Sequence, residues 1–259
     1  GVRPASYHVL NGLIHLGAAL ALFGILRRTL LHAFARGQLT QATGNGCAAG
    51  PPATALALAI TLLWAAHPLQ TESVTYVIQR AESLMGLWYL LTLYCFVRGA
   101  ELPQATEAAS GRARSAWLAL SVGACLLGMA TKEVMVSAPV IVLLYDRAFV
   151  SGTIAAAWRR RRLYYGGLAA SWLLLGALVL STRDRGGSMG LGLSVSLGDY
   201  LLTQGPAILH YLRLVVWPQP LVFDYGKSEV ADKAAASVVE SLARCGITVQ
   251  PNGLEPGGY

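Results

Sequence analysis

The sequence has few charged residues. Asp, Glu, Lys and Arg make up 13% of its 259 residues, whereas a soluble domain carries about 25%. So few charged residues could not cover the surface of a soluble globular protein of this size. They fall between uncharged apolar runs of roughly the 17 to 25 residues that cross a hydrocarbon core about 30 Å thick. With 54% hydrophobic residues and a mean hydropathy of +0.50, the sequence predicts an all-α, polytopic transmembrane helical bundle.

Cysteine motifs and a secretory leader are also lacking. The four cysteines are scattered without CxxC or CxxH spacing, which leaves no case for a disulfide framework or a metal site. The opening residues, GVRPASYHVLNG, have neither an initiating Met nor a basic n-region, and are typical of the middle of a longer sequence. The net charge of +7 lies largely in short loops. Membrane topology therefore explains it better than affinity for nucleic acid.

Six apolar segments are present, and they predict six membrane spans, at residues 8–31, 52–66, 81–97, 116–130, 134–150 and 163–181. Residues 99–115 and the arginine run at 158–162 are predicted to connect spans. The stretch 199–217 differs, because Pro206 and Arg213 fall where a span would be driest. It predicts an interfacial amphipathic helix instead.

Composition divides the chain into two regions. Residues 1–226 are predicted to form the membrane-embedded region. Residues 227–259 are soluble in character, which predicts a disordered or partly helical tail with a helix at 229–244.

The distribution of Lys and Arg predicts the orientation of the spans. One side would receive eleven basic residues: Arg27, Arg28, Arg36, Arg98, Arg112, Arg114, Arg147, Arg159, Arg160, Arg161 and Arg162. The other side would receive five: Arg3, Arg80, Lys132, Arg183 and Arg185. The first side is therefore predicted to be cytoplasmic, and the polar bridge at 67–80 to face the outside or the lumen.

Basic residues on the predicted outer side have acidic neighbours in the sequence: Glu72 and Glu82 near Arg80, Glu133 beside Lys132, and Asp184 beside Arg183. These groups would converge on an anionic headgroup such as a phosphate, which the planar guanidinium of arginine binds bidentately. A plainer interpretation competes. The bridge is then an interfacial loop with snorkelling ends, and the Lys-Glu pair is the tip of a helical hairpin.

His8, Asn11 and His15 lie on one face of the first predicted span. Polar side chains within a span usually face the bundle interior or a wet cavity. Two interpretations stay open for this face, interhelical hydrogen bonding and the lining of a site.

The polar bridge opens a segment with a family pattern. HPLQTESVTYVIQRAESLMGLWYLLTLYCFVRG, residues 67–99, resembles the hallmark segment of the transmembrane and tetratricopeptide repeat proteins, which are polytopic glycosyltransferases that use lipid-phosphate sugars. The pattern is carried by His67, Pro68, Thr71, Glu72, Val74, Arg80 and Glu82. YHVLNGLIH, KEVMVSAPVIVLLYDRAF and YLLTQGPAILHYLRLVVWPQPLVFDYG also match, in the family's order, over about 220 residues.

The resemblance implies a protein O-mannosyltransferase, or a bacterial relative, acting on the outer or luminal face. Such an enzyme moves a sugar from a dolichyl or undecaprenyl phosphate donor to Ser or Thr hydroxyls of an acceptor protein, with no tightly bound cofactor. It needs a carboxylate base and cations for the departing phosphate. The implied roles are catalysis by Glu72 and Arg80, contact with lipid phosphate or sugar by His67, Lys132, Glu133 and Arg183, and cavity lining by His8, Asn11 and His15.

Two features of that family are missing from this sequence. Members carry an acidic pair in a first outer loop, after an initial helix, and continue into tetratricopeptide repeats of about 34 residues. This sequence starts downstream of the first feature and shows no such repeat after Lys227. It is therefore interpreted as an internal fragment, inactive alone, of an enzyme in a bacterial inner membrane or the endoplasmic reticulum. The alternatives are a lipid-linked sugar transporter and a non-catalytic membrane scaffold.

Overall fold

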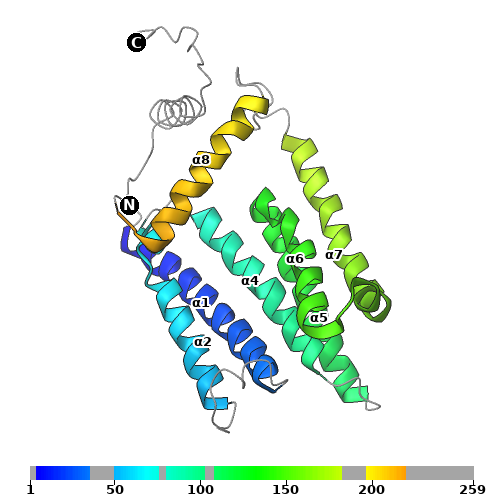
Figure 1. Cartoon of the computed structure of the whole chain (residues 1–259). Helices are drawn as coiled ribbons and strands as arrows, with labels where there is room; N and C mark the ends of the chain where they lie inside the picture. The colour runs from blue at the N-terminus through cyan, green and yellow to red at the C-terminus, as the bar shows by residue number, and fades with distance from the viewer. Residues whose placement is uncertain (1–3, 36–49, 76–79, 103–107, 183–196, 220–259) are drawn as a thin grey trace, which may run out of the picture. The chain divides into compact units, whose positions relative to one another are not determined.

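The computed structural model of the chain forms two compact units, Gly1–Gly186 and Gly187–Tyr259. The structure describes residues 4–35, 50–75, 80–102, 108–182 and 197–219. All regular secondary structure within those residues is helical (Figure 1). The prediction of an all-α fold is confirmed.

Among the described residues, five segments of the first unit are long and apolar enough to cross a membrane. They lie in α1 (Pro4–Ala35), α4 (Arg80–Glu101), α5 (Ala108–Thr131), a segment of mixed helix type from Glu133 to Ser151, and α7 (Ile154–Thr182). α2 (Gly50–Ala65) is shorter, and would make a sixth span only together with the bent turns that follow it. The helical bundle agrees with the sequence-based prediction. The second of the six predicted spans is long enough only if α2 and the bent turns after it are counted together.

The bridge after α2 forms two short helical turns. η2 (Pro68–Gln70) and α3 (Thr71–Thr75) follow α2 with a bend of 58°. Pro68 explains the bend, because it lacks an N–H for the helical ladder and disfavours helical geometry in the residue before it. His67 is accordingly extended, at φ −64° and ψ 134°. Its Nδ1 accepts a hydrogen bond from the Leu69 N–H at 3.2 Å and thereby caps η2.

The first unit has its core between α4, α5, α7 and the mixed-helix segment that contains α6 (Ala138–Tyr145). α4 and α5 form the most extensive helix pair, and α1 packs against α2 and α4 (Figure 1). Phe96 is fully buried and stacks on Tyr164, with 5.5 Å between ring centres. Gly128 lets α5 approach Met135 closely, since a Cβ at this position would overlap the Met135 side chain.

Large apolar side chains cover the outer faces of the helices. Leu63, Leu163 and Leu173 are each more than two-thirds exposed, at 74%, 90% and 77%. In water, apolar patches of this kind are a liability. In a membrane the same side chains face hydrocarbon, while the helices satisfy their own backbone groups. The surface therefore suits a multi-pass membrane protein.

Two helices extend further than the sequence predicted, and a third is broken within the arginine run. α4 continues past Arg98 to Glu101 and α5 begins at Ala108, whereas α7 consists of two helices joined at Arg161, whose φ of −138° and ψ of 34° are not helical. The prediction that 99–115 connects spans is therefore wrong over most of its described part, while the break at Arg161 falls within the predicted connection at 158–162. Ala, Arg and Glu are strong helix formers, and an arginine side chain can reach out of the apolar layer. The Arg98 guanidinium also has an aromatic neighbour on α5, since it lies 5.0 Å from the centre of the Trp117 ring.

The second unit contributes α8 (Leu197–Val216). Its apolar part is short, Ala207–Val216, and α8 does not qualify as a membrane span by length and composition. This agrees with the prediction that 199–217 is not a seventh span, and its interfacial location stays a prediction. The tail at 227–259 lies outside the described residues.

Candidate functional site

Arg80, the first residue of α4, is held by two residues of α1. Its Nε donates a hydrogen bond to Asn11 Oδ1 at 3.1 Å, and its guanidinium carbon lies 4.9 Å from the centre of the Tyr7 ring. Its Nη2 is buried without a hydrogen-bond partner. Within the described part of the chain, no carboxylate forms an ion pair with Arg80. The guanidinium is therefore oriented and partly desolvated, and its charge is uncompensated by those residues.

Asn11 is fully buried and uses both ends of its amide. Its Oδ1 accepts from Arg80, and its Nδ2 donates to the main-chain oxygen of Val74 at 3.3 Å. His8 Nδ1 lies 3.4 Å from the same oxygen. Val74 belongs to α3. Through these contacts, side chains of α1 tie α3 and α4 to α1.

His15 extends this polar face of α1. Its Nε2 lies 3.0 Å from the main-chain oxygen of Ala65, the last residue of α2. Its ring stacks on Trp64, with 5.2 Å between ring centres. His8, Asn11 and His15 thus all contact main-chain carbonyls. These contacts favour the interpretation of this face as interhelical hydrogen bonding, with Asn11 also orienting Arg80.

Lys132 forms an ion pair with Glu82, in the first turn of α4. The two side chains are 30% and 41% exposed. Lys132 directly precedes η3 (Glu133–Ser137), so the pair joins the end of α5 to the start of α4. The sequence suggested Glu133 as the neighbour of Lys132, but Glu133 is exposed. The positive charge of Lys132 is therefore already balanced by Glu82.

The sequence did not single out Tyr7, although its position four residues before Asn11 places both on one helix face. His67 acts locally as the cap of η2. Glu72 lies in α3, but its side chain is outside the described residues, as is all of Arg183. Their roles stay predictions. Among the described residues, no group of three or more His, Cys, Asp or Glu side chains could hold a metal ion.

Comparison with known proteins finds the same family as the motifs. Protein O-mannosyl-transferase tmtc2 of Xenopus laevis is 33% identical over 98 residues, which cover 38% of this chain and 9% of that protein. Protein O-mannosyl-transferase Tmtc3 of Drosophila melanogaster is 30% identical over 154 residues, covering 56% of this chain and 15% of the relative. Over part of its length, the chain is similar to the Tmtc O-mannosyl-transferases.

Tmtc2 of Drosophila melanogaster gives a similar match, 29% identical over 150 residues, covering 56% of this chain and 13% of the relative. The resemblance to the transmembrane and tetratricopeptide repeat family is thereby confirmed. The aligned part of the chain spans only 9% to 15% of the length of these relatives. No protein-family model matches the sequence, and no solved structure matches it significantly.

Proposed function

We propose that this chain forms the donor-phosphate side of a membrane-embedded glycosyltransferase. The sugar, mannose by analogy with the names of the relatives, passes from a polyprenyl phosphate to a Ser or Thr hydroxyl of an acceptor protein. The observation that carries this proposal is the Arg80 guanidinium, which Asn11 and Tyr7 orient and which has a buried Nη2 without a hydrogen-bond partner.

The chemistry of the donor explains why such an arginine is needed. As the bond between the anomeric carbon and the phosphate oxygen breaks, the departing phosphate gains negative charge. A guanidinium presents N–H donors that match phosphate oxygens, and a cation fixed in advance stabilises the developing charge without reorganisation. Asn11 occupies the Nε of Arg80, so Nη2, which has no hydrogen-bond partner, is left for the phosphate.

The proposal also assigns the base that activates the acceptor and the side of the membrane on which the reaction occurs. Glu72 lies on α3, two residues before the carbonyl that Asn11 and His8 contact, and we propose that its carboxylate accepts the proton of the acceptor hydroxyl. The distribution of Lys and Arg supports a location of this end on the periplasmic or luminal side. The donor would reach it from the surrounding lipid.

The test compares Arg80→Ala with Arg98→Ala. The two arginines lie on the same helix, about 27 Å apart along its axis, and each guanidinium lies over an aromatic ring. Each also has one buried nitrogen without a hydrogen-bond partner. Both substitutions therefore remove a comparable arginine from α4, and only Arg80→Ala changes the proposed site.

Two quantities are measured in membranes with matched amounts of each variant, made in the full-length protein wherever this sequence is part of a longer one. One is transfer of labelled mannose from a polyprenyl-phosphate donor to an acceptor protein, and the other is labelling by a photoreactive polyprenyl phosphate. A hydrogen bond to a charged group contributes about 1.5 to 3 kcal/mol, so Arg80→Ala should lower both by about 10- to 100-fold. Arg98→Ala should leave both unchanged. Equal losses in the two variants would refute the site, and labelling without transfer would favour a transporter or a scaffold.

A further inference from the structure

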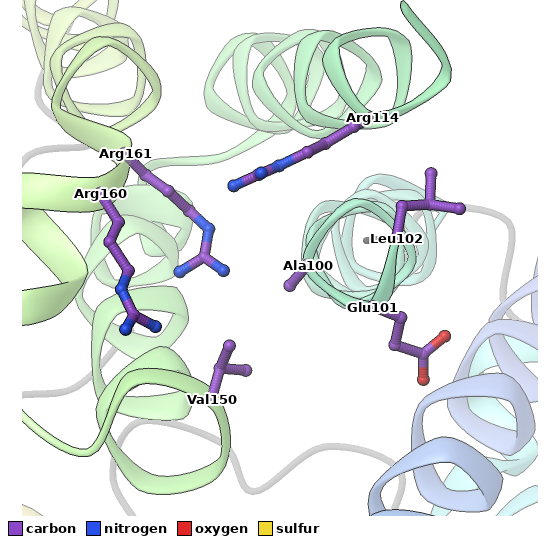
Figure 2. A pocket seen from close by; sticks show the side chains of 7 residues that line it. All are labelled: Ala100, Glu101, Leu102, Arg114, Val150, Arg160 and Arg161. Carbon is purple, nitrogen blue, oxygen red and sulfur yellow. The ribbon is translucent and has the colours of Figure 1, made fainter. Parts of the chain in front are cut away.

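Three arginines line a pocket at the opposite end of α4 from Arg80. The pocket has a volume of about 300 Å³. Its lining consists of Arg114 from α5, Arg160 and Arg161 from α7, Val150, and residues 100–102 at the end of α4. Figure 2 shows the three arginine side chains extending from two helices into the same space. The charge balance of this pocket determines what it can bind.

Arg161 is balanced inside the bundle. Asp146 is fully buried and accepts two hydrogen bonds from Arg161 Nη1, at 3.0 and 2.7 Å. Tyr165 Oη and Ser151 Oγ also donate to this carboxylate, at 2.5 and 2.7 Å. Both oxygens of Asp146 therefore have donors, and its single charge is matched by that of Arg161. Arg161 Nε is buried without a hydrogen-bond partner.

The carboxylate of Glu101 is also committed, although Glu101 lines the pocket. It accepts hydrogen bonds from Arg28 Nη1 at 2.5 Å and from His32 Nε2 at 3.2 Å, both on α1. In Figure 2 this carboxylate points away from the three arginines. Among the residues that the structure describes, no carboxylate lies within ion-pair distance of Arg114 or Arg160. Two of the three arginines in the pocket thus lack an acidic partner there.

We propose that this pocket binds the phosphate group of an anionic membrane phospholipid. Two arginines from different helices can hold phosphate oxygens from two sides, and guanidinium groups match phosphate geometry. A volume of about 300 Å³ is at the small end of ligand pockets, which suits a headgroup rather than acyl chains. Basic pockets between membrane helices bind anionic headgroups in this way.

The surface beside the pocket favours a lipid over free phosphate. Trp158 and Leu163 flank the pocket arginines on α7 and are 51% and 90% exposed. Trp is enriched where membrane and water meet, and an exposed Leu suits contact with an acyl chain. An inorganic phosphate ion would make no use of either side chain.

The experiment compares two double variants with the same loss of charge. Arg114→Gln/Arg160→Gln removes the two unbalanced arginines of the pocket. Arg159→Gln/Arg162→Gln removes two exposed arginines on either side of Arg160 and Arg161, neither of which lines the pocket. The whole chain is placed in lipid nanodiscs of phosphatidylcholine with phosphatidylglycerol, and lipid retained after transfer to detergent is counted by native mass spectrometry. A parallel sample holds phosphatidylcholine with inorganic phosphate.

The pocket variant should retain at least tenfold less phosphatidylglycerol than the unmodified chain, whereas the control variant should match the unmodified chain. Unmodified chain in phosphatidylcholine with inorganic phosphate should show no bound phosphate. Equal losses in the two variants would overturn the proposal in favour of diffuse surface charge. Retention of inorganic phosphate, competing with the lipid, would overturn the lipid as the ligand. Circular dichroism of both variants checks that the helices remain.

Discussion

Arg80 Nε meets Asn11 Oδ1 at 3.1 Å although 69 residues separate them in the sequence. The same amide donates from its other end to the Val74 carbonyl. Asn11 therefore cannot turn toward a different partner without losing one of two hydrogen bonds in a buried place. The direction of the Arg80 side chain is in this way set by α1.

Asn11→Ala should destabilise the protein and weaken donor binding. It leaves the Val74 carbonyl and Arg80 Nε without their Asn11 partner, at a cost of about 1 to 3 kcal/mol for a buried group. Affinity for polyprenyl phosphate should fall less than in Arg80→Ala, because the positive charge remains. Thermal unfolding in detergent and photolabelling measure the two effects. Ser73→Ala is the control, since among the described residues that hydroxyl forms a hydrogen bond only with Gln70, at 3.2 Å. An equal loss of stability in Ser73→Ala would contradict a special role for Asn11.

Lys132→Gln should leave donor affinity within about twofold, because the Lys132 charge is already used by Glu82. A partly exposed ion pair contributes only about 0 to 1 kcal/mol, so the melting temperature should change little. Titration with a short-chain polyprenyl phosphate measures the affinity. A tenfold loss would instead restore the interpretation of Lys132 as a phosphate ligand. Glu82→Gln distinguishes the cases further, since it frees Lys132 and should raise the affinity.

Asp146→Leu should destabilise the first unit strongly. The substitution leaves Arg161 buried without its acid, and breaking one side of a buried ion pair costs about 3 to 5 kcal/mol. Asp146→Leu/Arg161→Met removes both charges and should recover part of this loss, because a buried pair pays a desolvation cost that apolar side chains avoid. Thermal unfolding of the single and double variants measures both effects on stability. A double variant less stable than the single one would show that Arg161 has a further essential contact.

Gly128→Ala should destabilise the packing of α5, because the added Cβ overlaps the side chain of Met135. Overpacking of this kind costs about 1 to 3 kcal/mol. Gly123→Ala is the matched control on the same helix, where a Cβ meets no atom within 4 Å. It should be neutral or slightly stabilising, by up to about 1 kcal/mol. Similar melting temperatures for the two variants would contradict the close approach of α5 to Met135.

Hydropathy predicted the helices and their order because a membrane span must be apolar over a fixed length and must satisfy its own backbone. The same rule does not determine where a helix ends. Arg98 stays in α4 by lying over Trp117, and α7 breaks at Arg161, whose side chain reaches Asp146. Each depends on a neighbouring helix, which the local sequence does not contain.

In the candidate site, too, features set by neighbouring residues could be predicted, whereas contacts between residues far apart in the sequence could not. The shared face of His8, Asn11 and His15 could be predicted because helical spacing is a local property. The partners of these side chains could not, since the Val74 and Ala65 carbonyls lie 50 to 66 residues away. Proximity in the sequence was also misleading for Lys132, which pairs with Glu82 on another helix rather than with Glu133.

The turn from Asp146 to Ser151, η4, is a π-helix. Its wider repeat brings residues five apart onto the same side, and Asp146 and Ser151 are five apart. In an α-helix of the same sequence the hydroxyl of Ser151 would lie well around the helix from the carboxylate. Deleting one residue between them would place the serine four residues after the aspartate, where an ordinary α-helix keeps both side chains on one face. The π-helix therefore accommodates one extra residue in this turn and still gives the Asp146 carboxylate its Ser151 donor.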